Sequence, residues 1–509
     1  MSPEVFSQFA SAHDSGTIAR QSTGCRDGKE VGLNIYGSDD RVFLLSQSTR
    51  YPLSMSALPS STEVLIVGAG PTGLACALGL AARNVPFLLV DALSEGHNSS
   101  RAVLMQASSL EALEAIHPSL PASIVAGGIQ SATFNAVDVH ERPIFTIRMD
   151  NALVKKTKYP FCLLVPQHRV EARMREALAQ KRRGGEVHWG KRVVDLRERE
   201  TEDGSVKWDV SFEGGETVQA RYVVAADGSK STIRSLAGIR FLNPYNKTPT
   251  EATPGEKDLS FVVADVLLED PLPAHTPHNA IQIMVGKGGV VLTAPIPAEP
   301  TDLSSRNLFR VYLGVPDTPP SKPDSAYLQA ILDARGPGSH TTTHPALKIV
   351  RVLDSSRYRT RPALAERYVH RASKGGAYVL LAGDSAHKHG PAGGQGMNMG
   401  VCDATELADI IADHLSSLSS SSASSLPTDD SKKPHTADAV ELFDAYSTRR
   451  RAVAKTVIDM VEGMTELERG GDGWDQWFRM NALWLAFKIP FINSTVAWQL
   501  SGLGHAVKK

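Results

Sequence analysis

Three glycines and one acid occur at a spacing that could bind a phosphorylated ligand. Gly68, Gly70 and Gly73 follow a short apolar stretch, and Asp91 comes 23 positions after Gly68. In this arrangement the first glycine permits a tight turn, the second lets the backbone approach a pyrophosphate, and the third allows close packing of helix and strand. A carboxylate at this spacing can accept hydrogen bonds from a ribose. The predicted dinucleotide-binding turn is Gly68, Ala69, Gly70, Pro71, Thr72 and Gly73, together with Asp91.

The surrounding sequence predicts the elements that would position this turn. A β-branched strand is expected over 63–68, an alanine- and leucine-rich helix over 74–83, and a second buried strand over 87–90. Together they form a βαβ unit of about 30 residues. The alternative is a glycine turn in another kind of α/β protein.

Asp227 stands in a second motif, directly after the apolar segment 222–226 and before Gly228. The pattern predicts a strand, an Asp-Gly turn and a helix that begins near Ser231 and Arg234. Taken alone, this is an ordinary strand–turn–helix.

A third motif joins an apolar strand to a glycine-rich loop. The predicted strand 377–382 leads into Gly383 and Asp384, and the segment 391–398 contains three glycines before a helix. Asp384 could hydrogen-bond a polyol, and the N–H groups of the loop and helix start could stabilise negative charge. Glycines would be needed there because side chains would block the approach of a flat ring.

The three motifs together resemble the group A flavoprotein monooxygenases, the class of para-hydroxybenzoate hydroxylase and phenol hydroxylase, over residues 62–460. The resemblance implies that the first motif binds the ADP half of FAD. It also implies that Asp227 serves FAD and NAD(P)H binding, and that Asp384 and the 394–398 loop hold the ribityl chain and the flavin. The further positions implied at FAD are Gly383, Pro391, Gly394, Gly396, Met397 and Asn398.

Two more positions match the same family. Arg101 resembles its arginine near the FAD phosphates, and Gln167 resembles its glutamine on the flavin side of the cofactor. Val103 departs from the phenol hydroxylases, which carry an aspartate base at this place. The resemblance therefore does not supply a catalytic base. His387 and His389 lie near the third motif, but a packing or solvent-facing role is the expectation for each.

The chemistry implied by the resemblance is oxygen transfer. NADPH or NADH would reduce FAD, and the reduced flavin would react with O2 to give a C4a-hydroperoxyflavin. That species would insert one oxygen atom into a small aromatic or enolic substrate. The apolar region 240–350 is the expected cover for the reactive edge, because water must be excluded from such a site.

Three alternatives stay open at this stage. The first is a flavin-dependent oxidase or dehydrogenase. The second is a halogenase, although Trp474 and Trp477 are spaced differently from the tryptophans of those enzymes. The third is a non-catalytic binding protein on the same fold, like the Rab-escort type, which would have no need of the flavin loop.

Length and composition set the wider frame. A chain of 509 residues is too long for a single hydrophobic core, so more than one domain is expected. With the motifs and the resemblance above, we expect an α/β protein with a Rossmann-type FAD-binding domain, a mixed or antiparallel-sheet substrate domain and C-terminal helices. The expected ranges are 1–60 for a poorly ordered N-terminal extension, 61–130, 160–239 and 351–412 for the FAD domain, 131–159 and 240–350 for the substrate domain, 413–437 for a mobile serine-rich loop, and 438–509 for the helical region. Within the FAD domain, residues 187–195 are expected to form one strand.

Charge and cysteine usage exclude some partners. The net charge is −1, which argues against binding of nucleic acid. The four cysteines are widely spaced and form no CxxC pair, so we expect free thiols, no metal site and a cytoplasmic location. Lys488, Pro490 and Asn493 interrupt the apolar segment 482–500, which predicts buried or interfacial helices and no transmembrane span. Both a monomer and an oligomer remain open.

Overall fold

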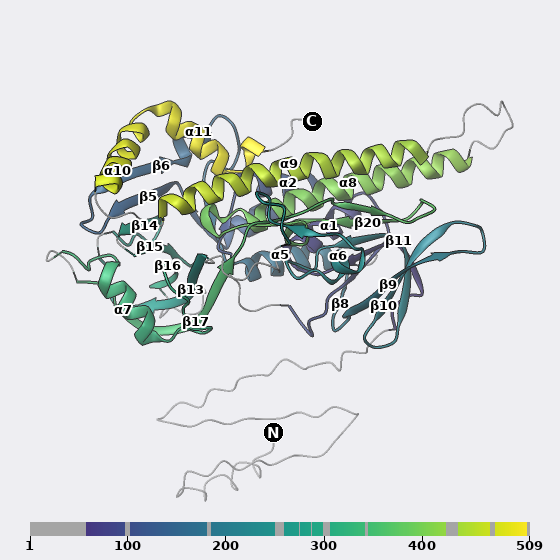
Figure 1. Ribbon diagram of the computed structural model, residues 1–509, viewed down its shortest axis with the longest axis horizontal. Helices are drawn as coiled ribbons and strands as arrows, with labels where there is room; N and C mark the ends of the chain where they lie inside the picture. The colour runs from purple at the N-terminus through teal and green to yellow at the C-terminus, as the bar shows by residue number, and fades with distance from the viewer. Residues whose placement is uncertain are drawn as a thin grey trace, which may run out of the picture. The chain divides into compact units, whose positions relative to one another are not determined.

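The computed structural model (Figure 1) describes residues 57–96, 102–180, 185–249, 259–273, 275–286, 288–298, 306–341, 345–423, 436–468 and 474–505. The described residues from Leu58 onward belong to one compact unit. The predicted N-terminal extension therefore lies almost entirely outside the described residues.

Eight strands of the described residues form the first sheet, which carries the sequence motifs. Five of them run parallel in the order β20-β11-β1-β2-β8, and β19, β10 and β9 add antiparallel pairings. Their bounds are β1 (Ser61–Val67), β2 (Phe87–Val90), β8 (Val187–His188), β9 (Val193–Glu200), β10 (Val206–Phe212), β11 (Thr217–Ala225), β19 (Val369–Arg371) and β20 (Tyr378–Leu381). The strands β2 and β20 and the second halves of β1 and β11 are apolar and buried because both faces of the sheet are covered there.

Helices cover this sheet and extend from it. α1 packs against both α5 and α8, which gives it a continuous apolar surface. The helices of this region are α1 (Pro71–Ala82), α2 (Ala107–Ile116), α3 (Leu120–Ala126), α5 (Gln167–Ala179), α6 (Thr232–Leu236), α8 (Gly396–Ala423) and α9 (Thr436–Glu468). Figure 1 shows α8 and α9 side by side.

The second large sheet has seven strands within the described residues, in the order β17-β13-β16-β15-β14-β5-β6. All neighbours are antiparallel except β14 and β5, so the predicted mostly antiparallel sheet is confirmed. The strands are β5 (Thr133–Asp138), β6 (Pro143–Arg148), β13 (Leu259–Leu268), β14 (Ile281–Gly286), β15 (Gly289–Pro295), β16 (Leu308–Val315) and β17 (Ile349–Thr360). The helices near it are α4 (Met149–Leu153), α7 (Ser325–Arg335), α10 (Trp474–Phe487) and α11 (Pro490–Leu500).

Two short sheets connect these parts. One joins β3 (Leu104–Met105), β7 (Cys162–Leu164) and β4 (Ile129–Ser131), and the other joins β12 (Phe241–Leu242), β18 (Ala363–Ala365) and β21 (His387–Lys388). Both include residues next to the sequence motifs.

The serine-rich segment differs from the prediction. Residues 413–423 continue α8 and do not form a loop. The hydroxyls of Ser416, Ser417 and Ser419 donate to carbonyl oxygens three or four positions earlier, so the helix itself satisfies them. Residues 424–435 of the predicted loop lie outside the described residues.

Two other boundaries also shift. The strand expected over 187–195 is split into β8 and β9, because Gly190 adopts a left-handed φ of 71° and turns the chain between them. The predicted start of the last FAD-domain segment, residue 351, falls inside β17, which pairs with β13 in the second sheet.

Candidate cofactor and active site

The three motifs follow three neighbouring parallel strands at the same sheet edge. The last register pairs are Val67 with Ala225 and Ala225 with Leu381. Beyond them, the Ala226 N–H donates to the Val67 carbonyl at 2.8 Å, and the Ala382 N–H donates to the Ala225 carbonyl at 3.1 Å. The segments beginning at 68, 227 and 383 therefore meet at the carboxyl edge, where open α/β sheets bind their ligands.

Each glycine of the first turn has a distinct steric reason. Gly68 has a φ of +105°, and a Cβ there would lie 2.3 Å from the Ala226 carbonyl oxygen. A Cβ on Gly73 would lie 1.8 Å from the Gly68 carbonyl oxygen, so helix and strand could not pack. A Cβ on Gly70 would meet no atom within 4 Å, so the space above it is open to a ligand.

The first turn also presents polar groups to that space. Gly70 caps α1 without a side-chain hydrogen bond, and Pro71 follows it, so the first N–H groups of the helix remain available. Asp91 follows β2 directly, and its Oδ2 accepts the Ala69 N–H at 2.7 Å. The carboxylate is thereby fixed beside the turn.

Thr72 brings the first and third motifs into contact. A Cβ on Gly383 would lie 2.5 Å from Thr72 Oγ1, and a Cβ on Gly400 would lie 2.3 Å from the same atom. Glycine at both positions therefore makes room for the threonine. The start of α1, the end of β20 and the first turns of α8 form one packed junction.

Asn398 ties the glycine loop to the segment that precedes α2. Its Nδ2 donates to the carbonyl oxygens of Leu104 at 3.0 Å and Gly394 at 2.8 Å, and its Oδ1 accepts the Gln106 N–H at 2.8 Å. Asn398 is 1% exposed, so these bonds form in a buried environment. Asn398 lies in the first turn of α8, and its side chain holds the preceding loop in shape.

The C-terminal segment supports the same loop from behind, which the sequence analysis did not predict. Gln395 Nε2 donates to the carbonyl oxygens of Gly393 at 3.1 Å and Leu500 at 2.9 Å. The Ser108 N–H donates to the Ser501 carbonyl at 3.1 Å. No local pattern links residue 395 to residue 500, because the contact spans the chain.

Asp384 and His389 flank the space at Gly396. A Cβ on Gly396 would lie 3.7 Å from Asp384 Oδ1 and 3.9 Å from His389 Nε2. Asp384 is exposed, whereas His389 is buried and burial lowers its pKa. His389 Nδ1 lies 2.7 Å from the Gly390 carbonyl, and Nε2 has no hydrogen-bond partner among the described residues.

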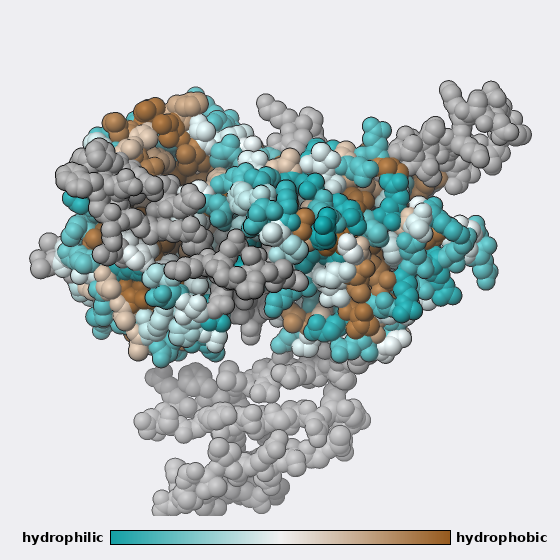
Figure 2. Space-filling view, in the orientation of Figure 1, coloured by the Kyte–Doolittle hydropathy of each residue, from teal (hydrophilic) through white to brown (hydrophobic). Residues whose placement is uncertain are grey.

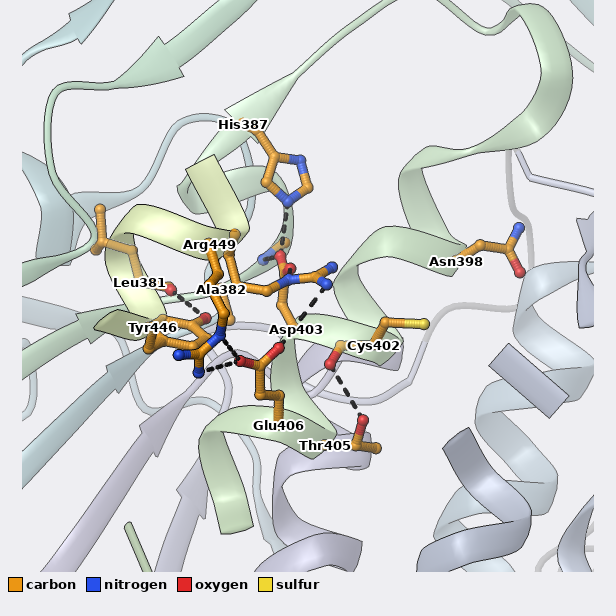
Figure 3. A network of polar contacts seen from close by, with 12 residues as sticks. Leu381, Ala382, His387, Asn398, Cys402, Asp403, Thr405, Glu406, Tyr446 and Arg449 are labelled. Atoms are coloured by element: carbon orange, nitrogen blue, oxygen red, sulfur yellow. Dashed lines mark hydrogen bonds and ion pairs between the residues drawn. The ribbon is translucent and has the colours of Figure 1, made fainter. Parts of the chain in front are cut away.

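A buried charge network lies behind the third motif (Figure 3). Asp403 Oδ2 lies 2.6 Å from His387 Nε2 and accepts the Gly383 N–H at 3.0 Å, and Asp403 Oδ1 accepts from Arg450 Nε at 2.5 Å. Burial acts to raise the pKa of Asp403, but the positive charge of Arg450, and then His387, outweighs it and lowers the pKa well below its ordinary range. His387 therefore packs in this network.

Asp403 and Arg450 were not singled out from the sequence. Asp403 lies on an α8 face whose neighbours Ala404 and Leu407 are fully buried. An acidic residue among apolar residues at helical spacing could have indicated a buried carboxylate, and a buried carboxylate needs a cationic partner.

Other predicted residues have structural partners near the site. Gln167 begins α5, its N–H donates to the Ala102 carbonyl at 3.1 Å, and its side chain donates to Glu171 at 2.8 Å. Asp227 Oδ2 accepts the Ile233 N–H at 3.1 Å, and burial raises its pKa. Pro391 and Met397 are half-buried in the loop region, and Arg101 lies outside the described residues.

Arg310 connects the second sheet to this site. It is 1% exposed and forms a two-bond pair with Asp265, at 2.6 and 2.7 Å. The remaining nitrogen of its guanidinium, Nη1, donates to the Ala102 carbonyl at 2.9 Å, and the next residue, Val103, is buried. Ala102, next to the predicted Arg101, is thus held by β16 of the second sheet and by the start of α5.

These features fit a dinucleotide that carries a ring system at one end. The open space at Gly70 and the free helix N–H groups suit a diphosphate, and Asp91 suits a ribose. The orphaned His389 Nε2 and exposed Asp384 offer polar contacts at the other end. Within the described part of the chain, no group of His, Cys, Asp or Glu side chains could hold a metal ion.

Comparison with known proteins gives one family match over most of the chain. The family described as FAD binding domain matches residues 61–426. The pentachlorophenol 4-monooxygenase of Sphingobium chlorophenolicum is 26% identical over 465 residues, which cover 89% of this chain and 73% of that protein. The 6-methylpretetramide 4-monooxygenase of Streptomyces rimosus is 32% identical over 354 residues, which cover 69% of this chain and 56% of that protein.

Solved structures show the same fold. The p-nitrophenol 4-monooxygenase PnpA from Pseudomonas putida DLL-E4 superposes with a TM-score of 0.66 at 22% identity, covering 87% of this chain and 99% of that one. The OxyS anhydrotetracycline hydroxylase from Streptomyces rimosus gives a TM-score of 0.61 at 25% identity, covering 87% and 76%. The predicted fold class is confirmed.

Proposed function

The chain belongs to the FAD binding domain family, and from that premise we propose that it is a NAD(P)H-consuming, FAD-dependent monooxygenase that acts on small aromatic or enolic compounds. The observation that carries the proposal is the meeting of the three motifs at one sheet edge, with open space above Gly70. A dinucleotide that spans this edge would contact all three.

We assign the ADP half of FAD to the first turn. The N–H groups at the start of α1 would bind the diphosphate above Gly70, and Asp91 would accept hydrogen bonds from the ribose. Because Asp91 already accepts the Ala69 N–H through Oδ2, its carboxylate is held in place before the ligand binds. Arg101 and Asp227 complete this assignment on the basis of family resemblance.

The flavin half is assigned to the third motif. Asp384 would bind the ribityl chain, and the loop of Gly394, Gly396, Met397 and Asn398 would face the ring. Asn398 fixes the loop through three hydrogen bonds, so its N–H groups would be oriented before the ring arrives. Pro391 and Gln167 are further contacts inferred from the family.

When bound, the reduced flavin would supply the activation of dioxygen, and the protein's residues would position and shield it. The buried Asp403 pair with Arg450 holds the Gly383 turn, and Arg310 holds the Ala102 segment. Both supports are almost fully buried, so the ring end rests on a rigid frame. We assign no catalytic base, since Val103 is apolar at the family's aspartate position.

The substrate class is inferred from the relatives. Their names describe monooxygenation of pentachlorophenol and of 6-methylpretetramide. An electron-rich ring or enol is the shared chemistry, and it suits transfer of an electrophilic oxygen. A phenolic panel is therefore the first set of compounds to test.

The test uses the full chain purified with its flavin. Yellow protein is expected, and NADPH or NADH oxidation should rise when a phenolic substrate is added. With ¹⁸O2, the product should gain one labelled oxygen atom. Free FAD with the same reagents is the control.

The alternatives give different results. Colourless protein that cannot take up FAD would favour a binding protein and contradict the proposal. Substrate oxidation that yields H2O2 without oxygen incorporation would identify an oxidase. Incorporation of halide in place of oxygen would identify a halogenase.

A further inference from the structure

The turn between α10 and α11 exposes a cluster of large apolar side chains. Trp484, Leu485, Ile489 and Phe491 are 44%, 61%, 50% and 77% exposed, within eight positions of sequence. Figure 2 shows this region as a brown area at the upper left, where Figure 1 places α10 and α11. We call these four residues the apolar tip. Grouped exposure of this kind marks a binding surface, whereas isolated apolar residues do not.

The apolar tip is held rigidly outward. Phe487 stacks on Phe145 of β6 with ring centroids 4.5 Å apart. Asn493 donates to the Thr146 carbonyl at 2.6 Å and accepts the Arg148 N–H at 3.2 Å. These contacts fix both helices on the edge strand of the second sheet, so the tip cannot turn inward without breaking them.

The tip itself carries one charge, and it is positive. From residue 481 to residue 500, Lys488 is the single charged residue. Its Nζ lies 3.5 Å from the centre of the Trp484 ring, so the positive charge lies at the exposed tip.

Two more lysines lie beside α11. α4 packs on α11, and the exposed Val154, Lys155 and Lys156 follow it. Lys156 Nζ lies 5.0 Å from the centre of the Trp498 ring of α11. Among the described residues, Lys155, Lys156 and Lys488 form no ion pair with a carboxylate.

Two acids of this neighbourhood are paired with other cations, and Glu111 lines one surface pocket together with Lys155 and Lys156. Asp150 lies 3.1 Å from Arg148, and Glu114 lies 3.0 Å from Lys158. Lys488 at the tip and Lys155 and Lys156 beside α11 outnumber Glu111, the one acid here that is unpaired among the described residues, so this side of the molecule carries an excess of positive charge.

We propose that the apolar tip and these three lysines dock the protein on the surface of an anionic phospholipid bilayer. Tryptophan, phenylalanine and leucine beside lysine are the residues that enter the headgroup boundary, and anionic lipids attract the cations. With 14 and 11 residues, α10 and α11 are each too short to cross a bilayer, which takes about 20 residues. Across the described residues, no helix qualifies as a membrane span.

A second copy of the chain fits this surface less well. A two-fold dimer places the same patch of both copies against itself. The Lys488 charges of both copies would then meet at an apolar contact, and the segment 481–500 contains no acid to neutralise them. A lipid phosphate supplies that negative charge.

The test is flotation of the flavin-loaded full chain with vesicles of phosphatidylcholine alone or mixed with phosphatidylserine. We expect binding to the mixed vesicles that weakens with salt. Leu485→Ser with Phe491→Ser should lower the bound-to-free ratio at least about tenfold. The triple change of Lys155, Lys156 and Lys488 to Gln should lower it roughly hundredfold on the mixed vesicles.

The matched control removes exposed apolar groups elsewhere. Val350→Ser with Leu353→Ser alters β17 side chains that are 61% and 49% exposed, and vesicle binding should not change. The visible flavin spectrum verifies that each variant is folded, and it does not depend on vesicles. The proposal would be overturned if the protein bound neither kind of vesicle. It would also be overturned if light scattering showed a dimer that the Leu485→Ser, Phe491→Ser variant cannot form. Vesicle binding is measured without turnover, so its outcome is separate from that of the monooxygenase assay.

Discussion

Gly70→Ala should separate cofactor binding from folding. The new methyl group would meet no protein atom within 4 Å, and the φ of −72° and ψ of −176° at Gly70 are accessible to alanine. The apo-protein should therefore keep its stability or gain about 0.4–1 kcal/mol from the reduced freedom of its unfolded chain.

The same methyl group would occupy the space assigned to the diphosphate. Loss of one hydrogen bond to a charged phosphate costs about 1.5–3 kcal/mol, which corresponds to a roughly ten- to hundredfold weaker FAD affinity. Fluorescence titration of the apo-protein with FAD measures the affinity, and urea unfolding of the apo-protein measures the stability.

Gly463→Ala is the matched control. Gly463 lies exposed in α9, and a Cβ there also meets no atom within 4 Å. It should stabilise the helix by about 1 kcal/mol and leave FAD affinity unchanged. If Gly70→Ala bound FAD as tightly as the wild type, the diphosphate could not lie above Gly70, and the cofactor assignment would be refuted.

Three further changes test the frame of the site. Gly73→Ala places a Cβ 1.8 Å from the Gly68 carbonyl oxygen, so the free energy of unfolding should fall by about 1–3 kcal/mol or more and FAD should be lost; an unchanged melting temperature would contradict the packing. Asp403→Asn removes the carboxylate nearest to the buried Arg450, leaving it only Glu406 at 3.8 Å, and should cost about 3–5 kcal/mol at neutral pH in urea unfolding. Because folding lowers the pKa of Asp403, the charged pair stabilises the fold at pH values above the ordinary carboxyl pKa. The difference in unfolding free energy between wild type and Asp403→Asn should therefore become smaller as the pH falls below about 4. A difference that stays constant with pH would show that the lost stability does not come from the charge of Asp403. Asp91→Ala should weaken FAD binding roughly ten- to hundredfold in the same titration, and full retention of FAD would remove the residue from the ribose site.

The parts of the site that follow strand ends could be predicted from the sequence. Gly68, Asp227 and Gly383 each stand directly after an apolar strand, and parallel strands bring their carboxyl ends to one edge. The space around Gly68, Gly70 and Gly73 agrees with the reasons expected for each glycine: a Cβ would clash at Gly68 and Gly73 and would meet open space at Gly70.

The parts that depend on distant contacts could not be predicted. Leu500 accepts a hydrogen bond from Gln395, and Arg310 donates to Ala102, yet neither pair has a local sequence pattern. The serine run misled for a different reason. A serine-rich composition predicts a loop, but the hydroxyl of a serine such as Ser416 can donate to a carbonyl oxygen of its own helix, so the same composition is compatible with a helix.

The hydrogen bonds of Gln395 and Ser108 to residues 500 and 501 also set the order in which parts of the cofactor site can form during synthesis. During synthesis, domains generally fold from the N-terminal side as the chain emerges. The βαβ unit at Gly68 can form early, whereas the rear support of the glycine loop exists only after residue 501 has been made. Nascent chains should accordingly acquire the nucleotide cradle long before they can retain a flavin ring.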